Sequence, residues 1–203
     1  MNPILELLAG IDPQHPLLEQ MAEGLRAEAE WRRGALELVE SLSDDELVAL
    51  NHQTTPPDVD PRLLAVAERE GVGVVRINLF SREAFLRFWR AGSLSPHYHR
   101  RSFATRLLNG SYHHLRFDND GTLDAPKLTP RTQEVLKEGD GYALDWRDYH
   151  FVMFPADATC TLTIHTPPAI PPRGEFPRQT RDEVLRLRVD VLASLTATAG
   201  SST

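Results

Sequence analysis

The stretch H-Y-H-R-R-S-F-A-T-R-L-L-N-G, residues 97–110, contains two histidines one residue apart, followed by a strand-like apolar run. On an extended strand the side chains of residues i and i+2 point to the same face, so His97 and His99 can bind one ion. A third imidazole is available at His150, in a second strand-like segment. Three neutral imidazoles leave coordination positions open for water, oxygen or a substrate. The sequence therefore predicts a metal site formed by His97, His99 and His150.

The spacing around these histidines resembles the two sequence motifs of the cupin superfamily. The first motif runs H-x-H, three or four residues, Glu, six residues and Gly. Here three residues separate His99 from Phe103, and six separate Phe103 from Gly110. The second motif runs G, five residues, P-x-G, two residues and H, and residues 139–150, G-D-G-Y-A-L-D-W-R-D-Y-H, keep that spacing. The resemblance covers roughly residues 72 to 168 and implies a jelly-roll barrel with a metal at its mouth.

Three motif positions carry other residues than the family's usual ones. Phe103 stands where the family has Glu, Asp145 where it has Pro, and Arg147 where it has Gly. An apolar side chain in place of an anionic ligand leaves the site with a higher net positive charge, which favours an anionic substrate on the metal. Within the cupins, ferrous sites with three histidines are the mark of the thiol dioxygenases, which are related to cysteine dioxygenase. Residues 92–117 resemble the corresponding stretch of that branch.

The resemblance to that branch does not extend to the segment before Pro167. Thiol dioxygenases carry Ser, His and Tyr at alternate positions just before a Pro-Pro pair, whereas this chain has Thr161, Thr163 and His165 there. The sequence thus predicts a three-histidine site without the Ser-His-Tyr triad. His165 is a candidate catalytic acid or base, because an imidazole titrates near neutral pH.

Further candidates for the substrate pocket lie on the neighbouring strands. Tyr112 is the second candidate catalytic residue. A guanidinium makes bidentate contacts with a carboxylate, so Arg106 or Arg101 is expected to bind an anionic substrate, and the sequence leaves open which of them faces inward. Tyr142 and Trp146 are expected to shape the pocket, although aromatic residues on such strands are more often part of the core or the rim.

Two adjacent histidines, His113 and His114, fall on one expected strand and should point to opposite faces of it. Either could line the barrel. Neither occupies a motif position, so a structural role is favoured for both.

The hydrophobic pattern places the site in a mainly β protein. Short segments rich in β-branched residues are separated by Asn-Gly and Asp-Gly turns, which is typical of a β-sandwich or barrel. Together with the resemblance, this predicts a cupin jelly-roll β-barrel with an N-terminal helical region and a C-terminal helix. The expected strands are 72–80, 84–90, 97–99, 103–108, 112–117, 132–136, 142–144, 150–154 and 159–165.

Three regions are expected along the chain. Residues 1–71 are predicted to be a helical region that packs on the barrel, with a capping box at Ser43 and a last helix over 61–70. Whether these helices form a lid over the barrel mouth is left open. Residues 72–168 are expected to form the cupin-like barrel with its metal site, and residues 169–203 a proline-rich segment and a C-terminal helix. The expected C-terminal helix has an apolar stripe, which indicates a surface that covers the sheet or mediates a homodimer. The stripe consists of Val184, Leu187, Val191 and Leu195.

Composition restricts the classes of partner and location. The formal net charge of −7 argues against a general nucleic-acid-binding protein, which would carry a basic patch. Cys160 is the only cysteine, so no intrachain disulfide can form and an oxidising compartment is not implied. No apolar run approaches the ~20 residues that span a bilayer, and the N-terminus lacks the features of a secretory signal. We therefore expect no membrane partner and a cytoplasmic location.

The leading interpretation is a mononuclear non-heme Fe(II) enzyme, a dioxygenase or other oxygenase, whose partners are O2 and a small, anionic organic substrate. A second interpretation keeps the metal, as Zn, Ni or Mn acting as a Lewis acid, in a redox-neutral lyase or isomerase where Tyr or His removes a proton. A third is a non-catalytic cupin that binds a small molecule. That third alternative would be favoured if the three histidines did not converge.

Overall fold

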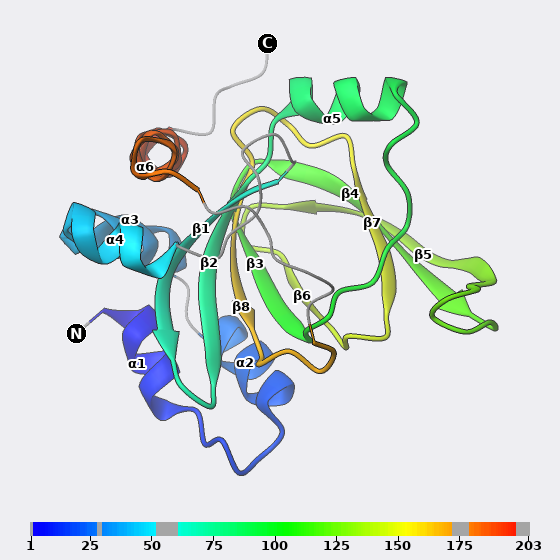
Figure 1. Ribbon diagram of the computed structural model, residues 1–203, viewed down its shortest axis with the longest axis horizontal. Helices are drawn as coiled ribbons and strands as arrows, with labels where there is room; N and C mark the ends of the chain where they lie inside the picture. The colour runs from blue at the N-terminus through cyan, green and yellow to red at the C-terminus, as the bar shows by residue number, and fades with distance from the viewer. Residues whose placement is uncertain (1, 28–29, 52–60, 172–178, 198–203) are drawn as a thin grey trace.

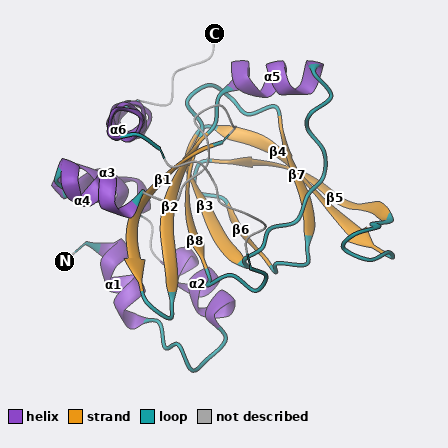
Figure 2. Ribbon diagram, viewed as in Figure 1, coloured by secondary structure: helices purple, strands orange, loops and turns teal. Residues whose placement is uncertain are grey.

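The computed structural model describes residues 2–27, 30–51, 61–171 and 179–197. Its strands form two antiparallel sheets that face each other as a jelly-roll barrel (Figure 1, Figure 2). The predicted mainly β fold is therefore confirmed. The five-stranded sheet runs in the order β1 (Arg62–Arg69), β2 (Gly73–Leu79), β8 (Cys160–His165), β3 (Phe103–Asn109) and β6 (Gly141–Leu144). The three-stranded sheet runs in the order β5 (Leu128–Lys137), β4 (Ser111–Asn119) and β7 (Tyr149–Met153).

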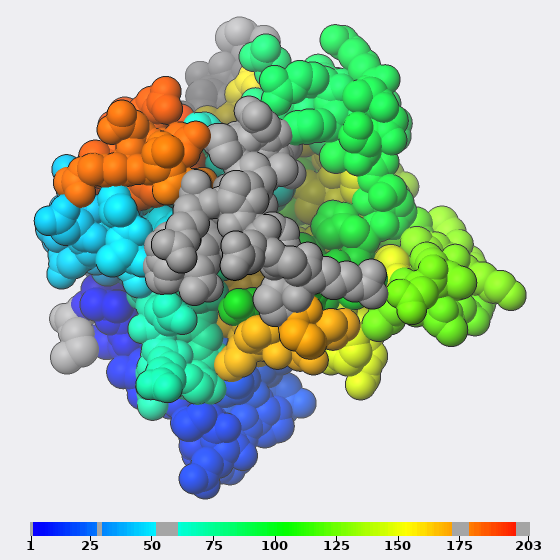
Figure 3. All heavy atoms as spheres, in the orientation of Figure 1, coloured from blue at the N-terminus to red at the C-terminus, as the bar shows by residue number. Residues whose placement is uncertain are grey.

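Helices occur at both ends of the chain, as predicted, and they cover the outer face of the five-stranded sheet. They are α1 (Pro3–Gly10), α2 (Leu17–Ala27), α3 (Trp31–Ser41), α4 (Asp44–Leu50) and α6 (Arg181–Thr196). Figure 3 shows α1 to α4, in blue and cyan, and α6, in orange, gathered on one side, while the β4–β5 hairpin projects from the other. No residue of α1 to α4 lines the central cavity. In the part of the chain that the structure describes, these helices pack outside the barrel rather than over its mouth.

The large hydrophobic core lies between the helices and the sheet, outside the barrel. It joins Met21, Val39 and Leu187 of the helices to Ile77 and Ile164 of the sheet. Each fully buried aliphatic side chain of this kind contributes about 1.5–3 kcal/mol relative to an exposed one. Because this outer layer stabilises the fold, the barrel interior is left free for polar side chains.

Two local signals in the helical regions are confirmed, the capping box at Ser43 and the C-terminal helix. Ser43 and Glu46 form the predicted capping box at the start of α4, where the Ser43 side chain accepts a hydrogen bond from the Glu46 backbone N–H. The apolar stripe of α6 is buried within the chain, so it covers the sheet; its members are Val184, Leu187, Val191 and Leu195. No helix in the described ranges is long and apolar enough to cross a membrane.

The predicted helix over residues 61–70 is wrong, because most of this segment is strand β1. Its leucines and alanines favour a helix in isolation. In the structure the segment pairs antiparallel with β2, beginning with Arg62 opposite Leu79. Gly71, predicted as a helix end, adopts φ 73° in the turn between the two strands. Strand pairing outweighs the local preference, so the sheet begins inside the region that was predicted to be helical.

Residues 84–90, predicted as a strand, instead form most of helix α5 (Arg82–Arg90). The Ser81 side chain caps the first turn by accepting a backbone hydrogen bond. Phe85 and Trp89 lie one helical turn apart, and their rings stack with centroids 6.0 Å apart. The partial alternation of apolar residues here reflects this helical face, not the faces of a strand.

The two motif glycines are explained by backbone geometry. Gly110 follows β3 with φ 79°, and a Cβ at this position would lie 2.8 Å from the Cα of Thr159. Gly139 precedes β6 with φ 88°. Both backbones lie in the left-handed region that favours glycine. The first turn joins β3 to β4 and the second joins β5 to β6; these strands carry Phe103, Tyr112 and Tyr142.

Candidate metal centre

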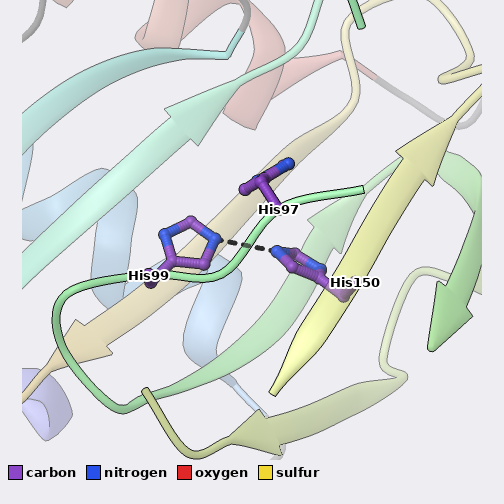
Figure 4. A group of neighbouring side chains, drawn as sticks. All are labelled: His97, His99 and His150. Atoms are coloured by element: carbon purple, nitrogen blue, oxygen red, sulfur yellow. Dashed lines mark hydrogen bonds between the residues drawn. The ribbon is translucent and has the colours of Figure 1, made fainter. Parts of the chain in front are cut away.

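The three predicted metal ligands, His97, His99 and His150, lie together between the two sheets (Figure 4). The segment before β3 is held against β7 by a pair of backbone hydrogen bonds. The N–H of His97 donates to the carbonyl of His150 at 3.0 Å, and the return bond is 2.9 Å long. The expected strand over 97–99 is reduced to this single bridge. One candidate ligand nitrogen from each ring lies within 4.8 Å of the other two.

The donor set fits a divalent cation. The Nε2 atoms of His99 and His150 are 2.8 Å apart and face each other. Metal–nitrogen bonds of about 2.1 Å at right angles would place two such nitrogens about 3 Å apart. Burial, and then the neighbouring His97, lower the pKa of His99 to about 3, and burial lowers the pKa of His150 well below its usual value. Both imidazoles are therefore neutral at pH 7 and can offer a lone pair. Such a site suits Fe(II), Zn, Ni or Mn.

Phe103 forms an apolar wall beside the histidines. Its ring centroid lies 4.8 Å from that of His99, 5.8 Å from His150 and 5.4 Å from His165. No carboxylate joins the three histidines in the described ranges. A cation bound here would keep its full positive charge, which agrees with the expectation drawn from the replaced motif residue.

A cavity of about 470 Å³ opens beside the histidines, inside the barrel. Three residues that line it each have a buried polar atom without a hydrogen-bond partner: Nε of Arg76, Oδ1 of Asn78 and Nε2 of His165. An unpaired buried polar atom costs roughly 1–3 kcal/mol. Polar side chains of this kind around one cavity favour a polar ligand over an apolar one.

Arg76 is the functional candidate that the sequence analysis missed. Burial lowers the pKa of its guanidinium to about 10, with Arg101 nearby as a second cause, so it remains charged at pH 7. No ion pair to it is found among the described residues. The signal was present in the strand V-V-R-I-N-L: Arg76 and Asn78 are two residues apart in an apolar run, so both point to one face. A half-buried guanidinium without a carboxylate partner is suited to bind an anion.

His165, Tyr112 and Tyr142 line the same cavity. Burial lowers the pKa of His165 well below its usual value, so this ring is neutral as well. The Tyr112 hydroxyl donates to the Tyr142 hydroxyl at 3.3 Å. Burial raises the pKa of Tyr142 to about 12 and that of Tyr112 well above its usual value. Both phenols are therefore protonated at pH 7, and they can donate hydrogen bonds but are poor bases.

Three residues predicted to bind substrate lie outside this cavity. Arg106 lies on the opposite face of β3 from Phe103, because odd and even residues of a strand alternate, and its guanidinium donates to the Leu25 carbonyl on the helix side. Trp146 lines a separate surface hollow, with the Arg147 guanidinium 4.6 Å from its ring centroid. Arg101 donates to the Thr166 carbonyl at 3.5 Å and does not line the cavity. Among the described residues, the arginine that lines the cavity is therefore Arg76, where Arg106 or Arg101 was expected.

His114, for which a structural role was expected, touches a metal-ligand candidate. Its Nε2 lies 3.1 Å from Nδ1 of His150, and its ring stacks on that of Tyr142 with the centroids 4.0 Å apart. His113 points to the outer face, where its ring lies 6.0 Å from that of Phe154. Strand alternation separated the two histidines correctly, but only the packing of β4 on β7 shows what His114 contacts.

The metal-free protein is expected to lose stability as the pH falls below 6.5. The pKa values of His99 and His114 drop from 6.5 to about 3 on folding, chiefly because both rings are buried. Between these values the unfolded chain binds more protons, so stability is complete above pH 6.5 and declines below it. The loss is about 1.4 kcal/mol per pH unit for each ring. Thermal unfolding of chelator-treated protein at about pH 7.5 and pH 5 tests this, and an unchanged midpoint would contradict it.

No protein-family model and no curated protein matches this chain. Solved structures that resemble it include a cupin-2 domain protein from Shewanella frigidimarina, 14% identical over 63% of this chain and 95% of that one, with a TM-score of 0.32. A hydroquinone 1,2-dioxygenase from Sphingomonas is 12% identical over 62% and 74%, with a TM-score of 0.38. Another hydroquinone 1,2-dioxygenase is 13% identical over 77% and 83%, with a TM-score of 0.39. Sequence identities of 12–14% and TM-scores of 0.32–0.39 carry no information on the activity of this chain.

Proposed function

We propose that the protein is a mononuclear non-heme Fe(II) oxygenase that acts on a small, anionic organic substrate. The observation that carries the proposal is one cavity that joins three imidazoles of lowered pKa, without a carboxylate, to a half-buried Arg76 that has no ion-pair partner among the described residues. A bound ferrous ion would supply the redox chemistry with O2, and the protein would supply binding and orientation.

The residues of the cavity have distinct roles in this proposal. Arg76 binds the anionic group of the substrate through charge-assisted hydrogen bonds. Asn78 offers its free Oδ1 to a hydroxyl or amino hydrogen, because its amide nitrogen already donates to the hydroxyls of Thr161 and Thr163 at 3.1 and 2.9 Å. Phe103, whose ring packs against those of His99 and His150, limits the access of water to these two histidines. A substrate held at both ends would be oriented toward the three imidazoles.

Oxygen uptake separates this function from its alternatives. Protein reconstituted with Fe(II) is expected to consume O2 in proportion to the loss of a small carboxylate that carries a thiol, hydroxyl or amino group. The zinc-loaded protein, which has the same ligands but no redox chemistry, is the matched control. Reconstitution is required because three imidazoles bind Zn or Ni more tightly than Fe(II). Substrate conversion under anaerobic conditions, with zinc as effective as iron, would contradict the proposal.

One observation favours a redox-neutral lyase or isomerase as the second candidate. His165 lines the cavity and its Nε2 has no hydrogen-bond partner, so this nitrogen offers a lone pair to a proton on a substrate carbon next to a carbonyl. Because burial lowers the pKa of His165, the imidazole is a weak base. Tyr112 is unsuited to this step because of its raised pKa. The premise of the non-catalytic alternative, histidines that fail to converge, is not met.

A further inference from the structure

We infer that His114 is a positioning residue of the metal site: it accepts a hydrogen bond from Nδ1–H of His150 and thereby presents the Nε2 lone pair of His150 to the cation. This inference rests on the metal binding assumed in the proposed function. It adds a residue outside the three-histidine set, with a role that can be tested without any knowledge of the substrate.

The ring of His114 is held rigidly in place. Its side chain is completely buried on β4, which pairs directly with β7, the strand of His150. The two side chains share the inner face of the three-stranded sheet. The His114 ring stacks on Tyr142 at 4.0 Å with an interplanar angle of 22°. The guanidinium of Arg116 lies 5.5 Å from the centroid on the same Tyr142 ring. These contacts fix the plane in which His114 meets His150.

The protonation pattern follows from the hydrogen-bond chain. A cation takes the lone pair of His150 Nε2, so the one ring hydrogen of this neutral imidazole must be on Nδ1. That hydrogen points to Nε2 of His114, 3.1 Å away, which must then be an acceptor. The neutral His114 ring therefore carries its hydrogen on Nδ1. Only one tautomer of each histidine is compatible with a bound metal.

Glu134 lies at the far end of this chain. It is the cross-strand partner of His114 on β5, and its Oε1 is 3.5 Å from His114 Nδ1. His114 Nδ1 has no hydrogen-bond partner, and 3.5 Å is longer than a usual N–H···O hydrogen bond. The carboxylate still attracts the Nδ1–H that the tautomer assignment gives to His114. The Glu134 side chain is 46% exposed. A continuous line of polar groups thus runs from the metal-facing nitrogen to the protein surface.

The other ligands do not share this arrangement. His97 has its Nδ1 3.2 Å from the carbonyl of Ser95, a backbone partner that no substitution removes. His150 depends on a side chain instead. Outer partners of metal-bound histidines contribute roughly 10–100-fold to metal affinity. We therefore expect the affinity of the site to be sensitive to residue 114.

Cobalt binding tests the inference. Co²⁺ is titrated into the full-length metal-free protein, and its dissociation constant and visible ligand-field spectrum are measured. His114→Phe keeps a ring on Tyr142 but removes the acceptor, and we expect the dissociation constant to rise by about 10–100-fold with an altered spectrum. His114→Gln offers an amide oxygen to His150 and should recover most of the affinity. His113→Phe, on the outer face of the same strand, should bind as the unsubstituted protein does.

The outcomes are distinguishable. If His114→Phe binds Co²⁺ with unchanged affinity and spectrum, the inference is wrong while the metal site stands. If His114→Gln loses as much affinity as His114→Phe, the acceptor has no role and the inference is again wrong. If the unsubstituted protein binds no Co²⁺, the proposed function fails together with the inference. Thermal unfolding of the metal-free variants checks that each is folded. His114→Phe leaves the buried Nδ1–H of His150 without its acceptor, so we expect this variant to unfold at a lower temperature but to remain folded under the conditions of the titration.

Discussion

Replacement of His99 by alanine is expected to remove metal binding and, with it, any metal-dependent activity. His99 faces His150 directly across the site, with its Nε2 2.8 Å from the other Nε2. Loss of one of three imidazoles leaves two ligands. The affinity for a divalent cation should then fall by on the order of 100-fold or more, because complete sites can supply about 10–16 kcal/mol of binding free energy. Elemental analysis of the purified variant and a Co²⁺ titration measure the effect.

His15→Ala is a suitable control for this experiment. His15 is exposed and lies near Asp12 at the N-terminal end, far along the chain from the site. It should retain the metal content of the unsubstituted protein. Unchanged metal content and activity in His99→Ala would contradict both enzymatic interpretations at once, because each of them places the cation on these three histidines.

Replacement of Arg76 by methionine is expected to weaken the binding of an anionic substrate by about 10–150-fold, the equivalent of one charge-assisted hydrogen-bonded contact of 1.5–3 kcal/mol. The loss should appear mainly in KM, since Arg76 holds the end of the substrate that does not react. Metal content should be unchanged, because no nitrogen of Arg76 belongs to the histidine cluster. Steady-state kinetics with charged and esterified forms of one substrate measure the effect.

Arg106→Met separates this role from a general loss of positive charge. Arg106 is on the opposite face of the five-stranded sheet, where it donates to the Leu25 carbonyl. Its replacement should alter stability rather than KM. A similar rise of KM in both variants would mean that long-range charge, not the position of Arg76 in the cavity, controls substrate binding. Equal use of the charged and esterified substrate by the unsubstituted protein would contradict an anion site altogether.

Much of the candidate site was predictable from local spacing. The distances along the chain between His97, His99 and His150 and the two motif glycines were sufficient to predict a barrel with three imidazoles together. The positive φ angles of Gly110 and Gly139 show why these positions tolerate no other residue easily. Phe103 in place of a carboxylate likewise predicted the ligand set, because the absence of an acidic side chain is visible in the sequence itself.

The polar lining of the cavity was less predictable, because it depends on which face of each strand turns inward. Arg76 and Arg106 are both arginines on apolar strands, yet only Arg76 shares a face with Thr163 of β8 and enters the barrel. Arg106 is paired with Leu162 and faces the helices. Alternation along a strand assigns residues to two faces, but the register with neighbouring strands decides which face is the interior.

The sequence by itself determined the class of fold, the three histidines and their lack of a carboxylate partner, since these depend on residue type and short-range spacing. Only the tertiary structure decided that residues 62–69 are a strand, that Arg76 lines the cavity and that His114 touches His150. Each of these depends on pairing between segments, whose free energy comes from cross-strand contacts and burial rather than from local propensity. The site is therefore a local motif whose chemistry is completed by side chains from other strands.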